Sequence, residues 1–262
     1  MAQINVYNLE GKKKGKIELP NVFNVKPRLD LIRKAHEVSQ SKNKQIQGRD
    51  KRAGLKKTAV SWGTGHGLSR APRIKGSGFL TARNVGRVPF AKGGRRAHPI
   101  KSEKNIVKKM NKKTLRASLI SAISASADLN WIKEKGHLVE EIPEVPLVVD
   151  DKIQTIKKTS NIYSVLCDLG LEKDLMKTKN SKKVRAGKGK RRGRKYKSGK
   201  GLLIVIKNDF GIVKASRNIP GTDVVTLEQL SVDHLAPGGT PGRLVVWTQS
   251  AVNELNDYEG EK

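Results

Sequence analysis

Arginine, lysine and aromatic side chains recur at short intervals between residues 62 and 96. Guanidinium groups bind phosphate oxygens through paired hydrogen bonds, and aromatic planes stack on unpaired bases. Residue types of this kind, interleaved with glycine, indicate contact with RNA. With two arginines that precede the stretch, the candidate RNA-binding residues are Arg49, Arg52, Trp62, Arg70, Arg73, Lys75, Arg83, Arg87, Lys92, Arg95 and Arg96.

A second segment, residues 177–200, consists mainly of lysine, arginine and glycine. Its charges repel one another in water, and phosphate groups relieve that repulsion while bound counterions are released. A solvated linker or a targeting signal could have the same composition. The segment lies between two core elements rather than at a terminus, which favours RNA contact. Its candidate RNA-binding residues are Lys188, Lys190, Arg191, Arg192, Arg194, Lys195 and Tyr196.

The two segments hold nearly all of the formal net charge of +30. Residues 44–100 carry 14 lysines and arginines against one acid, Asp50, and residues 177–200 carry 13 with no acid. The rest of the chain is close to neutral. Charge concentrated in this way predicts a folded body with two cationic extensions that become ordered against a polyanion.

Enzyme chemistry finds little support in the sequence. The glycines at 63, 65 and 67 match neither phosphate-binding fingerprint, and the single cysteine and five scattered histidines have no metal-ligand spacing. His234 follows Asp233 but has no candidate nucleophile, so a surface or capping role is expected. We therefore predict no catalytic residue, no metal and no cofactor. An enzyme acting on RNA and a DNA-binding chromatin protein remain the rival interpretations.

The remaining pattern predicts an α/β fold: a mainly parallel sheet with helices on both faces. Residues 1–43 and 101–262 would form the globular domain, 44–100 an extended loop, and 177–200 a basic arm inserted in the domain. Expected strands are 3–8, 16–19, 146–149, 202–206, 223–226 and 244–248. Expected helices are 27–42, 102–130, 162–169, 210–217, 227–235 and 249–256.

The first twenty residues lack the apolar stretch of a signal peptide, and the longest bulky apolar run is Leu202–Ile206. A bilayer-spanning helix needs about 20 apolar residues. No membrane contact is therefore expected, and the chain is predicted to be soluble and intracellular.

Several motifs together resemble one known family. They are Ser61-Trp-Gly-Thr-Gly65 with Arg70-Ala-Pro-Arg73, Gly93-Gly-Arg-Arg-Ala-His-Pro99, Lys188-Gly-Lys-Arg-Arg-Gly-Arg-Lys-Tyr196, and Leu235-Ala-Pro-Gly-Gly239 with Pro241-Gly-Arg-Leu244. In this order they are similar to the L-four family of large-subunit ribosomal proteins, in its archaeal form. The similarity extends over essentially the whole chain.

The resemblance implies a structural protein of the cytoplasmic ribosome that supports assembly and has no enzyme activity. It implies a globular domain on the outer side of the large subunit and a long loop threaded through ribosomal RNA. The loop tip would line the nascent-peptide exit tunnel, with Trp62, His66, Arg70 and Arg73 facing it. The implied partners are large-subunit ribosomal RNA, neighbouring ribosomal proteins and the nascent polypeptide.

Overall fold

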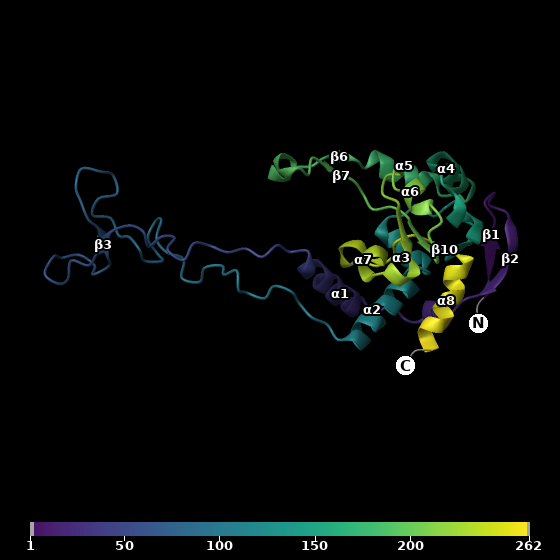
Figure 1. The fold of residues 1–262 in the computed structure, drawn as a ribbon, viewed down its shortest axis with the longest axis horizontal. Coiled ribbons are helices and arrows are strands. Elements are labelled where there is room, and N and C mark those ends of the chain that lie inside the picture. The colour runs from purple at the N-terminus through teal and green to yellow at the C-terminus, as the bar shows by residue number, and fades with distance from the viewer. Residues whose placement is uncertain (1–2, 261–262) are drawn as a thin grey trace. The chain divides into compact units, whose positions relative to one another are not determined.

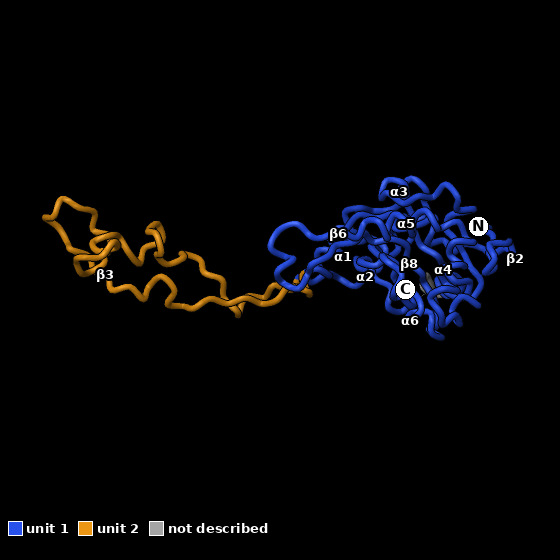
Figure 2. Tube along the Cα trace, turned by 90° about the horizontal axis from the view of Figure 1, so that it is seen from above, with its two compact units in different colours: residues 1–40, 108–262 blue, residues 41–107 orange. Residues whose placement is uncertain are grey.

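The structure, a computed structural model, describes residues 3–260. It divides the chain into two compact units, residues 1–40 with 108–262 (unit 1) and residues 41–107 (unit 2), as Figure 2 shows. The sequence analysis placed these boundaries at 43/44 and 100/101. The second boundary differs more because the helix expected from Ser102 does not form, and residues 101–111 have no regular structure.

A six-stranded sheet forms the centre of unit 1 (Figure 1). Its strand order is β2-β1-β5-β10-β8-β9, in which β1 and β2 pair antiparallel and every other neighbouring pair is parallel. The predicted fold class is confirmed. The strands are β1 (Gln3–Tyr7), β2 (Lys13–Glu18), β5 (Leu147–Val149), β8 (Leu203–Ile206), β9 (Asp223–Thr226) and β10 (Val245–Thr248).

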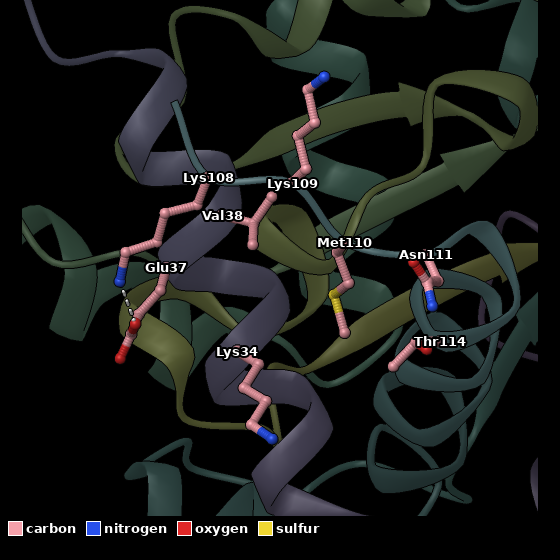
Figure 3. Close-up of a pocket in the computed structure, with 8 residues that line it drawn as sticks. All are labelled: Lys34, Glu37, Val38, Lys108, Lys109, Met110, Asn111 and Thr114. Carbon is pink, nitrogen blue, oxygen red and sulfur yellow. Dashed lines mark hydrogen bonds and ion pairs between the residues drawn. The ribbon is translucent and has the colours of Figure 1, made fainter. Parts of the chain in front are cut away.

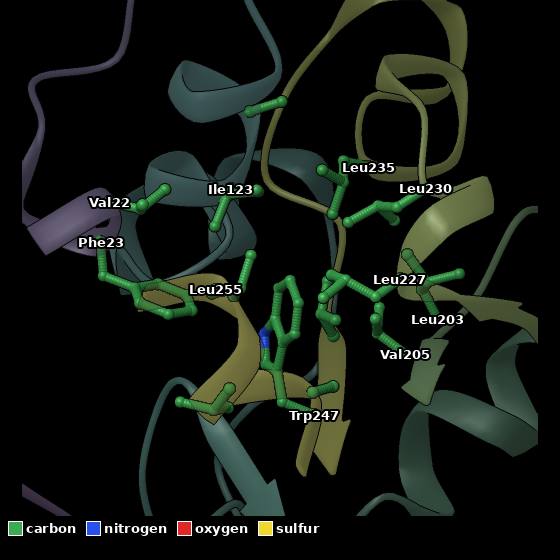
Figure 4. Packing of buried hydrophobic residues seen from close by; sticks show 14 of the residues in the cluster. Val22, Phe23, Ile123, Leu203, Val205, Leu227, Leu230, Leu235, Trp247 and Leu255 are labelled. Carbon is green, nitrogen blue, oxygen red and sulfur yellow. The ribbon is translucent and has the colours of Figure 1, made fainter. Parts of the chain in front are cut away.

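The central strands β5, β8 and β10 are apolar at every position except Thr248, because both faces of the sheet are covered. Successive side chains of a strand point to opposite faces. In β8, Leu203 and Val205 accordingly join one buried cluster, whereas Ile204 and Ile206 join the other. The first cluster surrounds Trp247, whose ring meets that of Phe23 edge-on at 5.5 Å between centroids (Figure 4).

Helices cover both clusters. The Trp247 side is packed by α1 (Leu29–Lys42), α2 (Lys112–Ala125), α7 (Val232–Leu235) and α8 (Gln249–Gly260), together with a 3₁₀ turn at Asn21–Asn24. The opposite side is packed by α3 (Leu129–Lys135), α4 (Thr159–Asp168), α5 (Glu172–Asn180) and α6 (Ile212–Ser216), with a 3₁₀ turn at Asp151–Thr155.

Two helix predictions were wrong in extent. The helix expected over 102–130 begins only at Lys112, because residues 101–109 are almost all exposed and offer no face to the core. It breaks before Asp128, whose side chain accepts a hydrogen bond from the backbone N–H of Asn130 and so starts α3. The helix expected over 227–235 is a 3₁₀ turn (Leu227–Gln229) followed by the single turn of α7.

The basic segments contain little regular structure. Unit 2 has only β3 (Ala59–Val60) and β4 (Arg73–Ile74), which pair antiparallel. The segment after α5 forms a hairpin of β6 (Lys183–Val184) and β7 (Tyr196–Lys197) around a 3₁₀ turn at Lys188–Arg192. The predicted arm began at residue 177, but residues 177–180 form the last turn of α5, where Thr178 is buried. We use "arm" below for residues 181–200.

Candidate nucleic-acid interface

A small group of backbone hydrogen bonds joins three segments in the distal part of unit 2. Ala59 pairs with Ile74 in the β3–β4 ladder, and an isolated bridge joins Arg73 to Val85. The N–H of Gly86 donates to the Pro72 carbonyl at 2.9 Å. These three segments thus lie side by side. They join the ends of two loops, residues 61–72 and 75–83.

The loop 61–72 and the start of β4 bring three of the four predicted tip residues together. The rings of Trp62 and His66 meet edge-on at 5.9 Å, and the guanidinium carbon of Arg73 lies 5.9 Å from the Trp62 ring centroid. The Ser61 hydroxyl donates to the Arg70 carbonyl at 2.8 Å and closes the loop. Arg70 therefore contributes its backbone to the loop, while its side chain is exposed and is not part of the ring cluster.

Arg73 differs from the other predicted RNA-binding residues of unit 2. Its guanidinium donates to the Arg83 carbonyl at 3.1 Å, and the side chain is half-buried. Arg73 consequently helps to set the conformation of the tip through this hydrogen bond. The remaining predicted residues of this unit are all exposed: Arg49, Arg52, Trp62, Arg70, Lys75, Arg83, Arg87, Lys92, Arg95 and Arg96.

The proximal part of unit 2 depends on a close approach of two backbone segments. Gly54 has a φ of +82°, and a Cβ there would lie 2.4 Å from the carbonyl oxygen of Gly94. Asp50, the single acid of residues 44–100, pairs with Lys56 at 2.6 Å. The hydrogen bond from Lys56, followed by one from the Arg52 backbone, lowers the pKa of Asp50. The one carboxylate of this segment is thus paired with a lysine of the same segment.

The arm is a hairpin whose two sides are joined by hydrogen bonds from Arg185. The backbone N–H of Arg185 donates to the Lys195 carbonyl at 2.8 Å, and its side-chain Nε donates to the Arg194 carbonyl at 3.3 Å. Its side chain lies across Gly189, where a Cβ would come 2.9 Å from Cδ of Arg185. The sequence analysis did not single out Arg185, since among thirteen basic residues only the glycine four positions later sets it apart.

The remaining cations of the arm face solvent. Tyr196 is 52% exposed, and the ammonium groups of Lys182 and Lys195 lie 5.4 Å and 5.5 Å from its ring centroid. Among the residues that the structure describes, no cation from 182 to 197 pairs with a carboxylate. The exposed predicted residues are Lys188, Lys190, Arg191, Arg192, Arg194, Lys195 and Tyr196.

The arm returns to the body at an ion pair between the buried Arg243 and the partly exposed Asp223. Arg243, only 1% exposed, donates to Asp223 at 2.7 Å and to the carbonyls of Gly201 (2.7 Å), Leu202 (3.1 Å) and His234 (2.8 Å). Burial would raise the pKa of Asp223, but Lys200 and Arg243 together hold it below its ordinary value. Lys200, the last residue of the arm, contacts Asp223 at 2.9 Å.

Comparison with known proteins identifies the family. The sequence profile described as the Ribosomal protein L4/L1 family matches residues 17–258. The chain belongs to this family. It is 42% identical over 256 residues to a Methanopyrus kandleri protein named large ribosomal subunit protein uL4, covering 98% of both chains. The protein of that name from Methanococcus aeolicus is 43% identical over 255 residues, covering 97% of this chain and 98% of that one.

Membership of the L4/L1 family makes the chain a structural constituent of the ribosome and not an enzyme, and it locates the chain at the cytoplasmic ribosome. The archaeal form suggested by the motifs is confirmed by these relatives and by Methanocaldococcus jannaschii uL4, 42% identical over 252 residues and covering 96% of this chain and 97% of its own. Among residues 3–260, no helix has the length and apolar character needed to cross a membrane.

Polar groups after strand β5 of this L4/L1-family chain are hydrogen-bonded to one another. In parallel α/β sheets, ligands bind beyond the carboxyl ends of the strands. Here Asp151, after β5, accepts hydrogen bonds from the backbone and hydroxyl of Ser250 at 2.9 and 2.6 Å and from Gln154 at 3.1 Å. Gln154 in turn accepts from the Asn208 backbone at 3.2 Å. These groups satisfy one another, so their arrangement is structural.

His234 and Cys167, the two side chains with possible catalytic chemistry, also have structural roles. His234 completes a capping box with Ser231 at the start of α7, as the capping interpretation expected. Burial, followed by repulsion from Glu172, raises the pKa of the half-buried Cys167 thiol, which disfavours the nucleophilic thiolate. Within the described part of the chain no three metal-ligating side chains gather.

A cleft of about 560 Å³ lies between α1 and the chain leading into α2 (Figure 3). Lys34, Val38, Lys109 and Met110 are among its lining residues, and Lys108 pairs with Glu37 at 2.8 Å across it. The cleft combines ammonium groups with apolar carbon atoms, and the one carboxylate among its lining residues, Glu37, is paired with Lys108.

Proposed function

We propose that unit 2 and the arm bind large-subunit ribosomal RNA and thereby support assembly of the subunit. The observation that carries this proposal is the exposure of the cations and their lack of carboxylate partners. Every residue of the predicted RNA-binding set except Arg73 is exposed, and within the described residues none of its cations pairs with a carboxylate. Exposed guanidinium and ammonium groups without protein acceptors are suited to phosphate oxygens.

The mechanism follows from size and charge. Packed RNA helices concentrate negative charge, and a narrow peptide rich in glycine enters crevices that a folded domain cannot. The hydrogen bonds of Arg73 and Arg185 to carbonyl oxygens fix the tip and the hairpin in advance, so less conformational entropy is lost on binding. Phosphate contacts of this kind position the protein without reading sequence.

The proposal includes a contact with the nascent polypeptide. On the family resemblance, the segment near Trp62–Lys75 would border the peptide exit tunnel, with Trp62, His66, Arg70 and Arg73 nearest to it. In that position the ring pair of Trp62 and His66 would present a rigid surface to the passing chain. Neighbouring ribosomal proteins complete the surroundings of the loop.

Footprinting of large-subunit RNA tests the RNA contact. The full chain should protect two separate sets of nucleotides, and replacing the exposed arm cations with alanine should remove one set and leave the other. Identical footprints for the two proteins would refute the role of the arm. In the free protein, amide hydrogens of residues 44–100 outside the hydrogen-bonded tip should exchange quickly, and uniform protection across the loop would contradict its ordering against RNA.

Cross-linking tests the tunnel contact separately. A photoreactive group on His66 should label nascent peptides in translating ribosomes, whereas the same group on Arg49 should label RNA. Labelling of RNA alone from both positions would refute tunnel lining while leaving RNA binding intact.

A further inference from the structure

A third concentration of cations lies outside unit 2 and the arm. Residues 108–116, Lys-Lys-Met-Asn-Lys-Lys-Thr-Leu-Arg, hold five lysines and arginines and no acid. The rest of unit 1 is close to neutral only because acids elsewhere in it offset this charge. The segment leads into α2, and its first four residues together with Thr114 line the cleft of Figure 3. Part of this charge therefore borders a cleft, called the α1–α2 cleft below.

The α1–α2 cleft presents cations and apolar carbon atoms together. Figure 3 shows Lys34 and Val38 on α1 and Asn111 and Thr114 at the start of α2, with Met110 between them. The volume of about 560 Å³ lies within the range of about 300–1,000 Å³ that is usual for ligand pockets. The cleft thus has room for a ligand of the size of one nucleotide unit.

The polar groups of this cleft are available to an external ligand. Glu37, the one carboxylate among the lining residues, is paired with Lys108 at 2.8 Å. Lys34 and Lys109 are exposed, and within the described part of the chain neither pairs with a carboxylate. Asn111 is the N-cap residue of α2, yet its side chain makes no capping hydrogen bond. Ammonium and amide donors can therefore meet acceptors from outside the protein.

The folding of α2 does not explain the lysines that follow the cleft. Lys112 and Lys113 occupy the first turn of the helix, which contains no acidic residue, and both are exposed. The helix dipole favours negative charge at this end, so two cations there are unfavourable in the free protein. An external anion would neutralise them.

We propose that the α1–α2 cleft is a third site for large-subunit RNA, with phosphates against Lys34 and Lys109 and sugar carbon atoms against Met110. This inference rests on the proposed function, because it extends the RNA contact of unit 2 along the chain. Unit 2 begins at Ser41 and ends at Val107, so the lining residues adjoin both of its ends in the sequence. Phosphate contacts of this kind position a protein on RNA.

Continuity of charge favours RNA over an acidic peptide as the occupant. From Lys92 to Arg116 the chain carries ten lysines and arginines and one acid, Glu103. The series begins among the cations predicted for unit 2 and continues through the cleft without a break. An RNA backbone supplies one phosphate per nucleotide, so one strand can neutralise successive cations and release counterions at each.

Site-directed cross-linking identifies the occupant. In a Cys167→Ser background, Asn111→Cys is the only thiol in the chain and can carry an aryl azide, which reacts with both RNA and protein. The labelled full chain is incorporated into large subunits by reconstitution and irradiated. We expect RNA to be labelled from position 111. Labelling of a protein alone, or of nothing, would overturn the proposal.

A pair of substitutions measures the contribution of the cleft. Lys34→Gln with Lys109→Gln should lower the slope of log affinity against log salt by about 1.4 to 1.8, because two phosphates lose their cations. A fourfold rise in salt should then weaken the binding of the unmodified chain to large-subunit RNA about 7- to 12-fold more than that of the variant.

The matched control replaces two exposed lysines on the other side of the sheet, as Lys152→Gln with Lys214→Gln. It has the same net charge as the cleft variant, so a global charge effect would change both slopes equally. We expect the control to keep the slope of the unmodified chain. Equal slopes for the cleft variant and the control would overturn the proposal.

Failure of this inference and failure of the proposed function give different results. If unit 2 and the arm leave their footprints but position 111 labels no RNA, the third site is refuted and the proposed function stands. If position 111 labels RNA while neither footprint appears, the third site is supported and the RNA binding proposed for unit 2 and the arm is contradicted.

Discussion

The salt dependence of RNA binding should fall when the arm loses its exposed cations. The relevant change replaces four neighbouring cations with alanine: Arg191, Arg192, Arg194 and Lys195. All four are exposed, and among the described residues none pairs with a carboxylate. The substitution therefore breaks no ion pair within the described part of the protein, and the fastening residue Arg185 stays in place.

The magnitude follows from counterion release. Each phosphate neutralised adds about 0.7–0.9 to the slope of log affinity against log salt, so four contacts contribute about 2.8 to 3.6. A fourfold rise in salt should then weaken the unmodified chain about 50- to 150-fold more than the variant.

Titration of a large-subunit RNA fragment with the full chain at several salt concentrations measures the slope. A matched control removes four exposed cations from the side of unit 1 formed by the Asp151–Thr155 turn, α4 and α6: Lys152, Lys158, Lys214 and Arg217. Both variants have the same net charge, so a purely global charge effect would change both slopes equally. Equal slopes for the two variants, or a slope for the arm variant equal to that of the unmodified chain, would refute the reasoning.

Three further outcomes are expected. Arg243→Ala should lower the free energy of unfolding by about 3–5 kcal/mol in urea denaturation, because Asp223 and buried carbonyl groups lose their donor; a loss below about 1 kcal/mol would contradict this. Gly54→Ala should open unit 2 to limited proteolysis, since its Cβ meets the Gly94 carbonyl, whereas Gly63→Ala, also at positive φ but in open space, should not; equal cleavage would contradict the close approach. Burial lowers the pKa of His234, so the folded state favours its neutral form, and stability should fall as the pH drops below the ordinary value of about 6.5. Urea midpoints at high and low pH should show a smaller fall in His234→Gln, and an identical fall in both proteins would refute this.

The sequence predicts the sheet well because burial on two faces leaves a strong signal. Leu203–Ile206 and Val245–Trp247 are apolar without interruption, a pattern typical of strands in a parallel sheet that is covered on both faces. The region after residue 101 misled the same reasoning. Ser102 and Glu103 have the residue types of a helix start, but a cap does not stabilise a helix that has no core to cover.

The candidate interface was predictable in composition but not in detail. Charge and glycine content mark both basic segments, yet periodicity carries no information about contacts between residues such as Arg73 and Trp62, or Arg185 and Gly189. Those contacts depend on turns whose geometry the sequence leaves open.

Arginine is used in three ways in this chain, and the local acceptors decide which. Arg243 is buried among carbonyl oxygens and Asp223, so its charge is satisfied inside the fold. Arg191 is exposed and has no carboxylate partner in the described residues, so its acceptors must come from outside. Arg73 and Arg185 lie between these cases, because each donates to a carbonyl of its own loop. Since those bonds set the loop shape that phosphates would meet, both should persist when RNA binds, and lysine at either position should not replace them because it lacks the planar donor set.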